Sequence, residues 1–431
     1  MPTQQGFINH IVNQIFDIAS DVKPLGSLGE AELPALIFAV EGHDAIYCIL
    51  KKGNEKYEQL SKQILRKNAE WANKFSEAYI NEKLESLLIK AAQGDSSEML
   101  TGYVNQFIAD LEDYTLEHTV FLPLANLSME IDTLEIGKII LNNMTVTFIE
   151  KLITQAEAHS IRPEMLHYQK DSERTHLRDL INQFKGDVCA EYHVIAEPGR
   201  AVERAEDECR RIFDLLRYAM ALLDPNEPNK YNFDLHFLTK GGWVSSSYTG
   251  FVFAQNVFDT IPRYNRSSKI FSISSNTLER MRGIGVFDLA AILKSDSAIT
   301  EFEEILLRGI HWFADAHIQT EKENKLLSLI TCLECFFSDR QADKIANSIA
   351  EGAAFTLGTN FDERKDLKEK VKDFYDKRSR VSHGGKKAIL DVELTELIKL
   401  VGEILAKMIS VKNIYRTQKD LFDWIEIQRL S

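Results

Sequence analysis

Cysteine is scarce in this 431-residue sequence, and the few cysteines form no framework. The five are odd in number and scattered, at Cys48, Cys189, Cys209, Cys332 and Cys335. Small secreted domains stabilised by disulfides carry an even set of cysteines at close spacings. The distribution therefore argues against such a domain, and we expect reduced thiols.

Long apolar runs are also missing. The first thirty residues show no basic start followed by an apolar stretch and a small-residue cleavage site. No segment reaches the roughly 18 apolar residues that a membrane span needs. We therefore expect a cytoplasmic protein without a membrane partner.

The sequence has no excess of positive charge, because its formal net charge is −14. Nonspecific adhesion to nucleic acid depends on Lys and Arg side chains that neutralise phosphates. The acidic balance argues against adhesion over the whole surface, so any RNA contact must be local.

What is present is the composition of an ordinary globular protein, 44% hydrophobic and 27% charged. The length predicts two or three domains. The spacing of apolar residues indicates a helical region at 1–116, a mixed α/β region at 117–299 and a helical region at 300–431. We therefore predict an α+β multidomain protein with an all-α bundle at its C-terminus.

The middle region contains short β-rich runs separated by polar residues. Strands are predicted over 118–127, 134–141 and 185–197. A helix is expected at about 201–218, and residues 231–275 indicate further strands and loops.

The C-terminal region shows helical spacing throughout. Five helices are predicted, at about 300–318, 321–338, 341–357, 362–383 and 391–414. The loops between them are short, so neighbouring helices should run antiparallel.

The fourth of these helices carries a charge where an apolar residue is expected. Its apolar stripe consists of Leu367, Val371, Phe374 and Val381, and Arg378 occupies the position between the last two. An arginine on a packing face is costly unless its guanidinium group meets an acid, a phosphate or a partner surface. The position of Arg378 therefore points to a specific role.

His383 comes five residues after Arg378 and is followed by Gly384-Gly385, which would end the helix with a left-handed cap. Five residues at about 100° each change the direction by about 140°, so the two side chains do not project side by side from a straight helix. Convergence requires a bent helix end, or a second copy of the helix across a dimer interface.

Segment 374–385, which reads FYDKRSRVSHGG, resembles the signature of HEPN domains, an arginine and a histidine separated by four to six residues. The surrounding helices, including 326–334 and 349–354, resemble in particular the Apea-like HEPN branch of bacterial anti-phage and other conflict systems. The resemblance covers about 100 to 120 residues, between about 300 and 420.

The resemblance implies a metal-independent endoribonuclease without a cofactor, in antiviral defence, abortive infection or toxin activity. A 2′-hydroxyl of RNA would attack the adjacent phosphorus and leave a 2′,3′-cyclic phosphate. Arg378 would bind the phosphate and His383 would be the general acid or base, roles that suit the chemistry of both side chains. The family also implies a homodimer through this domain.

Other residues of the motif are assigned to the same site. Ser379 stands where many HEPN domains have Asn or Asp, and its hydroxyl group can still donate to phosphate. Gly385 stands where the branch regulated by nucleotidylation has a tyrosine, so we do not expect that regulation. Tyr375 and Asp376 are assigned as supporting residues.

Basic residues next to the motif are candidates for RNA contact. Between residues 364 and 387, ten residues are Lys or Arg and four are Asp or Glu, a local excess that can guide RNA. We assign RNA binding to Lys377, Arg380, Lys386 and Lys387. The alternative is an ordinary solvated helix face.

Glu334 lies at the edge of the apolar stripe formed by Leu327, Ile330 and Phe337, where a carboxylate usually needs a partner. We predict that Glu334 orients Arg378. A core ion pair with some other base is the alternative.

Three further patterns are interpreted as structural. Cys332 and Cys335 have the CxxC spacing, but they lie in an apolar helix without a second ligand pair, so we expect no metal or redox site. Segment 282–285, which reads RGIG, lacks the context of a phosphate-binding loop and is predicted to be a turn. Isolated histidines are interpreted as structural, namely His193, His236, His311 and His317.

Two alternatives to the nuclease remain open. The helical domain can instead be a catalytically silent scaffold for dimerisation or RNA binding, or an assembly module for another activity at 118–275. Under the leading hypothesis, residues 1 to about 300 act as a sensor or regulatory region for a phage-derived or nucleotide trigger.

Overall fold

A computed structural model describes most of the chain and divides it into two compact units. The described residues are 4–28, 33–39, 46–159, 178–179, 181–223, 235–237, 248–254, 257–263, 270–295, 297–338, 345–382 and 389–430. The first unit comprises Met1–Val120, His193–Arg204 and Val252–Phe258, and the second comprises Phe121–Tyr192, Ala205–Phe251 and Asp259–Ser431. The division into three regions stays a prediction, and its boundary near residue 300 falls inside the second unit.

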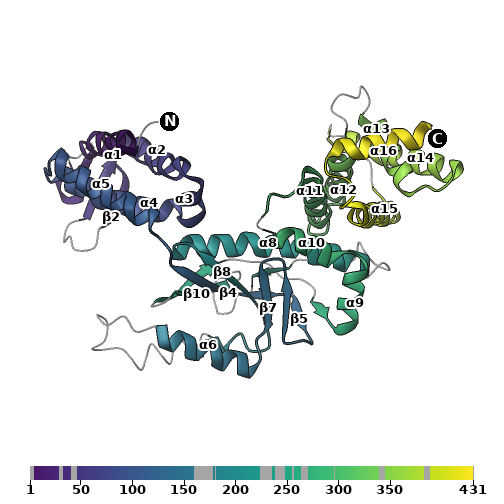
Figure 1. Cartoon of the computed structure of the whole chain (residues 1–431), viewed down its shortest axis with the longest axis horizontal. Coiled ribbons are helices and arrows are strands. Elements are labelled where there is room, and N and C mark those ends of the chain that lie inside the picture. The colour runs from purple at the N-terminus through teal and green to yellow at the C-terminus, as the bar shows by residue number, and fades with distance from the viewer. Residues whose placement is uncertain are drawn as a thin grey trace. The chain divides into compact units, whose positions relative to one another are not determined.

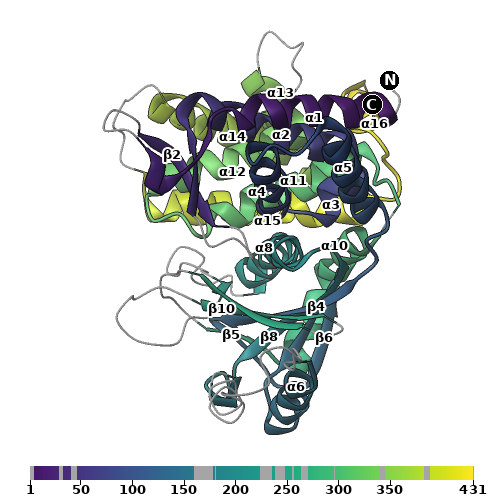
Figure 2. The same ribbon diagram turned by 90° about the vertical axis from the view of Figure 1, so that its left-hand side faces the viewer.

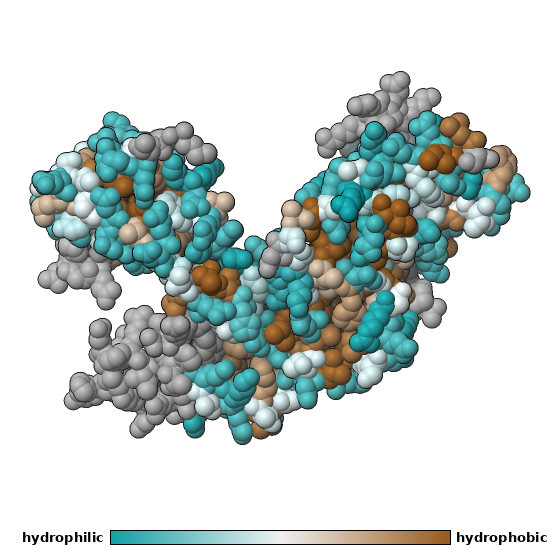
Figure 3. All heavy atoms as spheres, in the orientation of Figure 1, coloured by the Kyte–Doolittle hydropathy of each residue, from teal (hydrophilic) through white to brown (hydrophobic). Residues whose placement is uncertain are grey.

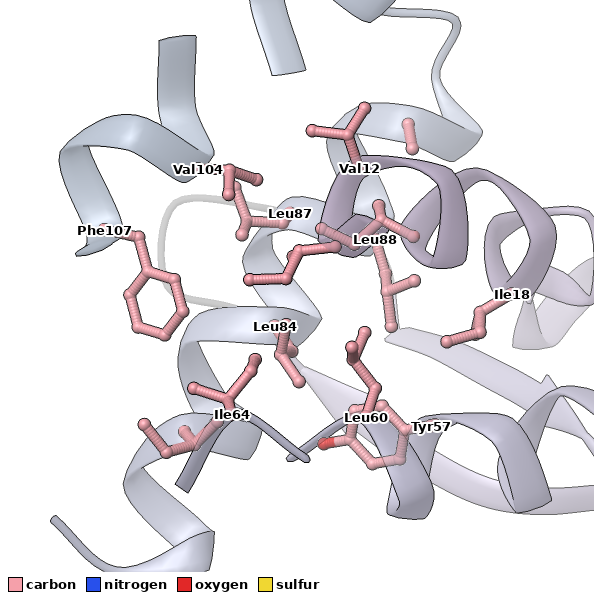
Figure 4. Packing of buried hydrophobic residues seen from close by; sticks show 14 of the residues in the cluster. Val12, Ile18, Tyr57, Leu60, Ile64, Leu84, Leu87, Leu88, Val104 and Phe107 are labelled. Atoms are coloured by element: carbon pink, nitrogen blue, oxygen red, sulfur yellow. The ribbon is translucent and has the colours of Figure 1, made fainter. Parts of the chain in front are cut away.

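Helices dominate the N-terminal part of the first unit (Figure 1). They are α1 (Gln4–Ala19), α2 (Lys51–Lys67), α3 (Ala69–Lys74), α4 (Glu77–Ala92) and α5 (Ser97–Glu112). Helix α1 packs against α2, α4 and α5. Figure 4 shows residues of this core, where Val12, Leu60 and Leu84 project into the space between the helices. Burial of such side chains is the main favourable contribution to folding.

A small antiparallel sheet, which the helical spacing did not predict, belongs to the same unit. Its order is β1-β3-β2, built from β1 (Val22–Pro24), β2 (Pro34–Ala39) and β3 (Ile46–Leu50), and the 3-10 helix Leu25–Ser27 follows β1. These strands have three to six residues, which is too short for an alternating pattern to stand out beside long helices.

The predicted mixed region contains a seven-stranded sheet of order β11-β10-β4-β8-β7-β6, with β9 paired to β4. The strands are β4 (Glu117–Ala125), β6 (Thr133–Ile136), β7 (Ile139–Asn143), β8 (Val188–Ile195), β9 (His236–Phe237), β10 (Tyr248–Ala254) and β11 (Val257–Arg263). A separate parallel pair joins β5 (Leu127–Met129) and β12 (Phe271–Ile273). The strands predicted at 118–127 and 185–197 are confirmed, whereas the run at 134–141 is a hairpin that turns at Gly137, with φ +61°.

Helices α6 (Val146–His159) and α8 (Pro198–Leu223) lie on opposite faces of this sheet (Figure 2). The helix predicted at about 201–218 is thus confirmed within α8. Helices α9 (Ser275–Gly283) and α10 (Val286–Lys294) follow the sheet. The turn predicted at 282–285 joins them, and Gly285 adopts φ +80°, a left-handed conformation that favours glycine.

The C-terminal residues form a stretch of helices, and all five predicted helices are confirmed. They are α11 (Glu301–Ala316), α12 (Lys322–Phe337), α13 (Ile345–Leu357), α14 (Phe361–Ser382) and α15 (Asp391–Val411), and a sixth helix, α16 (Gln418–Leu430), was not predicted. Ser328 bonds to Asp315 while Phe336 lies against Gly309, so α11 and α12 run antiparallel.

The packing of α13 against α12 depends on a glycine. A Cβ atom added at Gly352 would lie 2.3 Å from Cδ1 of Phe337, a fully buried ring that has little freedom to move. We expect Gly352→Ala to lower the free energy of unfolding by about 2 kcal/mol, measured by urea denaturation. The matched change Gly102→Ala, in the open on α5, should instead raise it by about 0.5 kcal/mol. Equal effects of the two changes would contradict this account of the packing.

The surface of the first unit that faces the viewer in Figure 3 is mostly hydrophilic, and apolar patches reach the surface of the second unit. Among the helices in the described ranges, none combines the length and the apolar character that a membrane span requires.

Candidate functional site at the end of helix α14

Helix α14 contains residues 374–382 of the predicted motif. The side chain of Asn360 accepts a hydrogen bond from the amide of Glu363 and so caps the start of the helix. Val371 and Phe374 are buried and anchor it in the bundle. The described part of the helix extends to Ser382. The predicted catalytic residue His383, together with Gly384, Gly385, Lys386 and Lys387, lies outside the described residues.

Arg378 faces α12, where it meets Glu334. The Nη2 atom of Arg378 lies 3.5 Å from Oε1 of Glu334, and the two side chains are 29% and 21% exposed. The Nε atom of Arg378 is buried and has no hydrogen-bond partner. Burial raises the pKa of Glu334, and the positive charge of Arg378 opposes that rise. The structure thus brings together the two charged residues that interrupt apolar stripes in the sequence.

Tyr375 belongs to the same cluster. The guanidinium carbon of Arg378 lies 5.8 Å from the centre of the Tyr375 ring, within the range of a cation–π contact. Burial raises the pKa of Tyr375, the charge of Glu334 adds to the rise, and Arg378 opposes it. The phenol therefore stays protonated at neutral pH and can donate a hydrogen bond.

The neighbouring basic residues point elsewhere. The Nζ atom of Lys377 lies 2.8 Å from Oε1 of Glu393 on α15 and also pairs with Asp373, and the lysine side chain is only 14% exposed. Burial lowers the pKa of Lys377, but the hydrogen bonds to these two carboxylates outweigh burial and raise the pKa. Lys377 is therefore engaged in the bundle, and our RNA-binding proposal does not rest on it.

The remaining described residues of the motif lie toward solvent. Arg380 is exposed, and its Nε atom donates to the carbonyl oxygen of Asp376 at 3.1 Å. Asp376 is exposed and Ser379 is half-buried. Arg380 is thus the predicted RNA contact whose charge remains most accessible among the described residues.

Carboxylates from other helices neutralise part of the basic stretch. Lys368 pairs with Glu351 on α13, and Lys370 pairs with Glu396 on α15. Sequence reasoning did not find these partners, because each lies on a separate helix at no fixed spacing. The local positive charge is therefore smaller than the count of Lys and Arg residues indicates.

The cluster can bind an anion through the guanidinium group. Arginine has five N–H donors in a planar fork that matches two oxygens of a phosphate. Glu334 contacts the fork at one nitrogen, at a distance longer than an ordinary charged hydrogen bond. Donors are therefore left for a second anion, and Glu334 fixes the side of the helix toward which the fork lies.

The cysteines of α12 do not add reactive groups to the site. Cys332 is fully buried, which raises its thiol pKa well above the usual value, and burial raises the pKa of Cys335 to about 11. Both thiols are therefore protonated at neutral pH and are poor nucleophiles. Within the described ranges, no group of three His, Cys, Asp or Glu residues is placed as metal ligands would be.

Comparison of the chain with protein-family models, with curated proteins and with solved structures finds no match in any of the three.

Proposed function

We propose that the C-terminal helical region is an endoribonuclease of the HEPN type. The observation that carries the proposal is the arginine at position 378, which is held by Glu334 with one guanidinium nitrogen unsatisfied, five residues before a histidine. Buried polar groups normally have partners, so the arrangement points to a specific role for this arginine, and its side chain is 29% exposed, which leaves guanidinium donors other than Nε for an incoming phosphate.

The proposed reaction needs a proton carrier and an anion binder. His383 takes the proton of the 2′-hydroxyl group or delivers one to the departing 5′-oxygen. The 2′-oxygen bonds to phosphorus as the bond from phosphorus to the 5′-oxygen breaks. The products are a 2′,3′-cyclic phosphate and a 5′-hydroxyl end. Arg378 stabilises the negative charge that grows on the phosphate oxygens, and Glu334 positions Arg378.

A second copy of the chain would complete the site. His383 follows Arg378 by five residues, which on a straight helix turns the side-chain direction by about 140°. This geometry favours pairing of the histidine of one copy with the arginine of another. Leu390 and Val392 are 56% and 70% exposed, next to Glu393, the partner of Lys377. Exposed apolar side chains this close to the motif support an interface there.

The ion pair between Arg378 and Glu334 also favours a competing function, a silent scaffold in which Arg378 only holds two helices together. Loss of one partner of this half-buried ion pair would then destabilise the bundle and change no cleavage. Under either function, we propose that the first 300 or so residues respond to a phage-derived or nucleotide trigger.

The first test is an RNA profile of bacteria that express the wild-type chain, His383→Ala or His10→Ala, with and without infection by a panel of phages. His10 is a matched control, because it is an exposed histidine on α1 whose Nε2 atom bonds to Gln63. Cleavage with 2′,3′-cyclic ends should occur with the wild type and His10→Ala and be absent with His383→Ala. Identical profiles for all three under every condition would favour the scaffold.

A further inference from the structure

A histidine and an aspartate that lie 97 positions apart in the sequence meet on the second unit, away from α14. The Nδ1 atom of His311 on α11 lies 2.8 Å from Oδ2 of Asp214 on α8. The other oxygen of Asp214 lies 3.2 Å from Nη1 of Arg217, a residue only 8% exposed, whose Nη2 donates to the carbonyl oxygen of Leu235. A carboxylate accepts hydrogen bonds, so Nδ1 of His311 carries a proton. The ring is thereby fixed in orientation, and its side chain remains 60% exposed.

The surroundings of His311 favour its charged form. The hydrogen bond to Asp214 raises the pKa of His311, partial burial opposes the rise, and the charges of Asp214 and Asp315 add to it while Arg217 opposes it. Other charged residues of the adjoining surface are Arg211, Glu304 and Arg308. A larger fraction of His311 is therefore an imidazolium near neutral pH than for an isolated histidine.

His311 stands at the rim of a hollow of about 410 Å³ formed by α8, α10, α11 and the chain before α11. The floor of the hollow is apolar, and it is formed by Leu215, Leu293, Ile299, Leu307 and Ile310. A second hollow of about 730 Å³ adjoins it and shares Arg211, Asp214 and His311. Pockets of 300 to 1,000 Å³ with apolar walls and a few polar groups are typical of small-molecule sites, as a rough guide.

The rim of the smaller hollow carries more positive than negative charge. Arg211, Arg308 and His311 contribute cations, and Glu304 and Asp214 contribute carboxylates. Asp214 already neutralises Arg217 behind the rim, and Arg211 pairs with Glu208 at 3.2 Å. Arg308 is exposed, and no residue that the structure describes forms an ion pair or a hydrogen bond with its guanidinium group.

We propose that this hollow binds a phosphate monoester with an apolar or aromatic body, of about the size of a nucleoside monophosphate. The body would lie on the apolar floor, and the phosphate would contact Arg308, His311 and Arg211. A phosphate monoester carries a charge of about −1.5 to −2 near pH 7 and three terminal oxygens. It can therefore use three separate cations, whereas one arginine suffices for a carboxylate.

The site is distinct from the proposed nuclease site, because α14 contributes no residue to the hollow. Its function therefore does not depend on RNA cleavage, and the two proposals can fail separately.

The test is isothermal titration of the full chain with adenosine monophosphate and with phenyl phosphate, each compared with adenosine and phenol. We expect saturable binding of both phosphates and much weaker binding of the two compounds without phosphate. Arg308→Gln and His311→Gln should each weaken phosphate binding about tenfold or more, which is the effect of losing one charged hydrogen bond. Arg66→Gln, an exposed arginine on α2, is the matched control and should bind like the wild type, as should Arg378→Gln.

The dependence of the affinity on pH tests whether the charge of His311 contributes to phosphate binding. Because the pKa of His311 is raised, the affinity of the wild type should be greatest below that pKa and should fall as pH rises through it. The His311→Gln variant should lack this loss and show only the titration of the ligand itself, whose second pKa is about 6. Thermal unfolding of each variant checks that the fold is retained. The absence of saturable binding of both phosphates at millimolar concentration, or equal affinity of the wild type, Arg308→Gln and His311→Gln, would overturn the proposal.

Discussion

Arg378→Gln is expected to slow RNA cleavage about 100- to 1,000-fold, a loss comparable to removal of one donor that stabilises a charged transition state. Glutamine is close in length but has no positive charge and no planar fork. The measurement is the initial rate of cleavage by purified protein, on an RNA that the wild type cuts. Arg66→Gln is the matched control, because Arg66 is an exposed arginine on α2, outside the basic stretch, and the rate of this variant should change little.

Glu334→Gln tests how the arginine is positioned. Glutamine keeps the shape of the side chain and removes the charge that lies 3.5 Å from Nη2 of Arg378. We expect a smaller loss, about tenfold, because the guanidinium group remains and only its orientation is less restricted. In the double variant the two losses should not multiply, because Glu334 acts only through Arg378. If Glu334→Gln and Arg378→Gln lower the stability of the protein and leave the cleavage rate unchanged, both residues are structural and the roles proposed for them in cleavage are wrong.

The C-terminal helices were predictable because their apolar residues repeat with helical spacing over three to six turns. The helix that was missed, α16, has a single buried residue, Leu421. A helix that contributes so little to the core leaves no apolar stripe in the sequence. The short N-terminal strands were missed for a related reason, since a three-residue strand such as Val22–Pro24 cannot display a period of two.

The candidate site was predictable because its two charged residues interrupt the apolar stripes of their helices. Arg378 and Glu334 each stand where a stripe of apolar residues would continue, so each required a partner, and they lie together across α12 and α14. His311 interrupts no apolar stripe, because it lies on an exposed part of α11. The sequence therefore indicated only a structural histidine. Its partner Asp214 is separated from it by 97 positions, and only the fold reveals such a pair.

Lys377 shows how little the position along the sequence says about which way a side chain points. In the sequence it stands next to Arg378 within a basic stretch, and that position suggested RNA contact. Adjacent residues on a helix point about 100° apart, so Lys377 turns toward α15 and Glu393 while Arg378 faces α12. The neighbour in sequence is therefore a poorer guide to the site than the residue three or four positions away.

Glu197→Ala is expected to lower the free energy of unfolding of the first unit by about 3 to 4 kcal/mol, because a single buried carboxylate serves the starts of two helices. Its Oε1 atom accepts hydrogen bonds from the amides of Ser76, at 3.0 Å, and Arg200, at 2.8 Å, and Oε2 accepts from Gly199 at 2.8 Å. Ser76 caps α4, and the other two amides belong to the first turn of α8. A negative charge is favoured at both helix starts, and each amide left without a partner costs about 1 to 3 kcal/mol.

The measurement for Glu197→Ala is urea denaturation of the full chain, with Glu70→Ala as the control. Glu70 also lies in the first turn of a helix, α3, but its side chain is 65% exposed and, among the residues that the structure describes, pairs only with Lys74. Its loss should therefore cost about 0.5 kcal/mol. Glu197→Gln separates charge from shape. Glutamine has one oxygen that can accept these hydrogen bonds, whereas glutamate has two. We therefore expect a free energy of unfolding between those of the wild type and Glu197→Ala. If Glu197→Ala costs no more than Glu70→Ala, the carboxylate does not hold the two helix starts, and the amides of Ser76, Gly199 and Arg200 must find other acceptors.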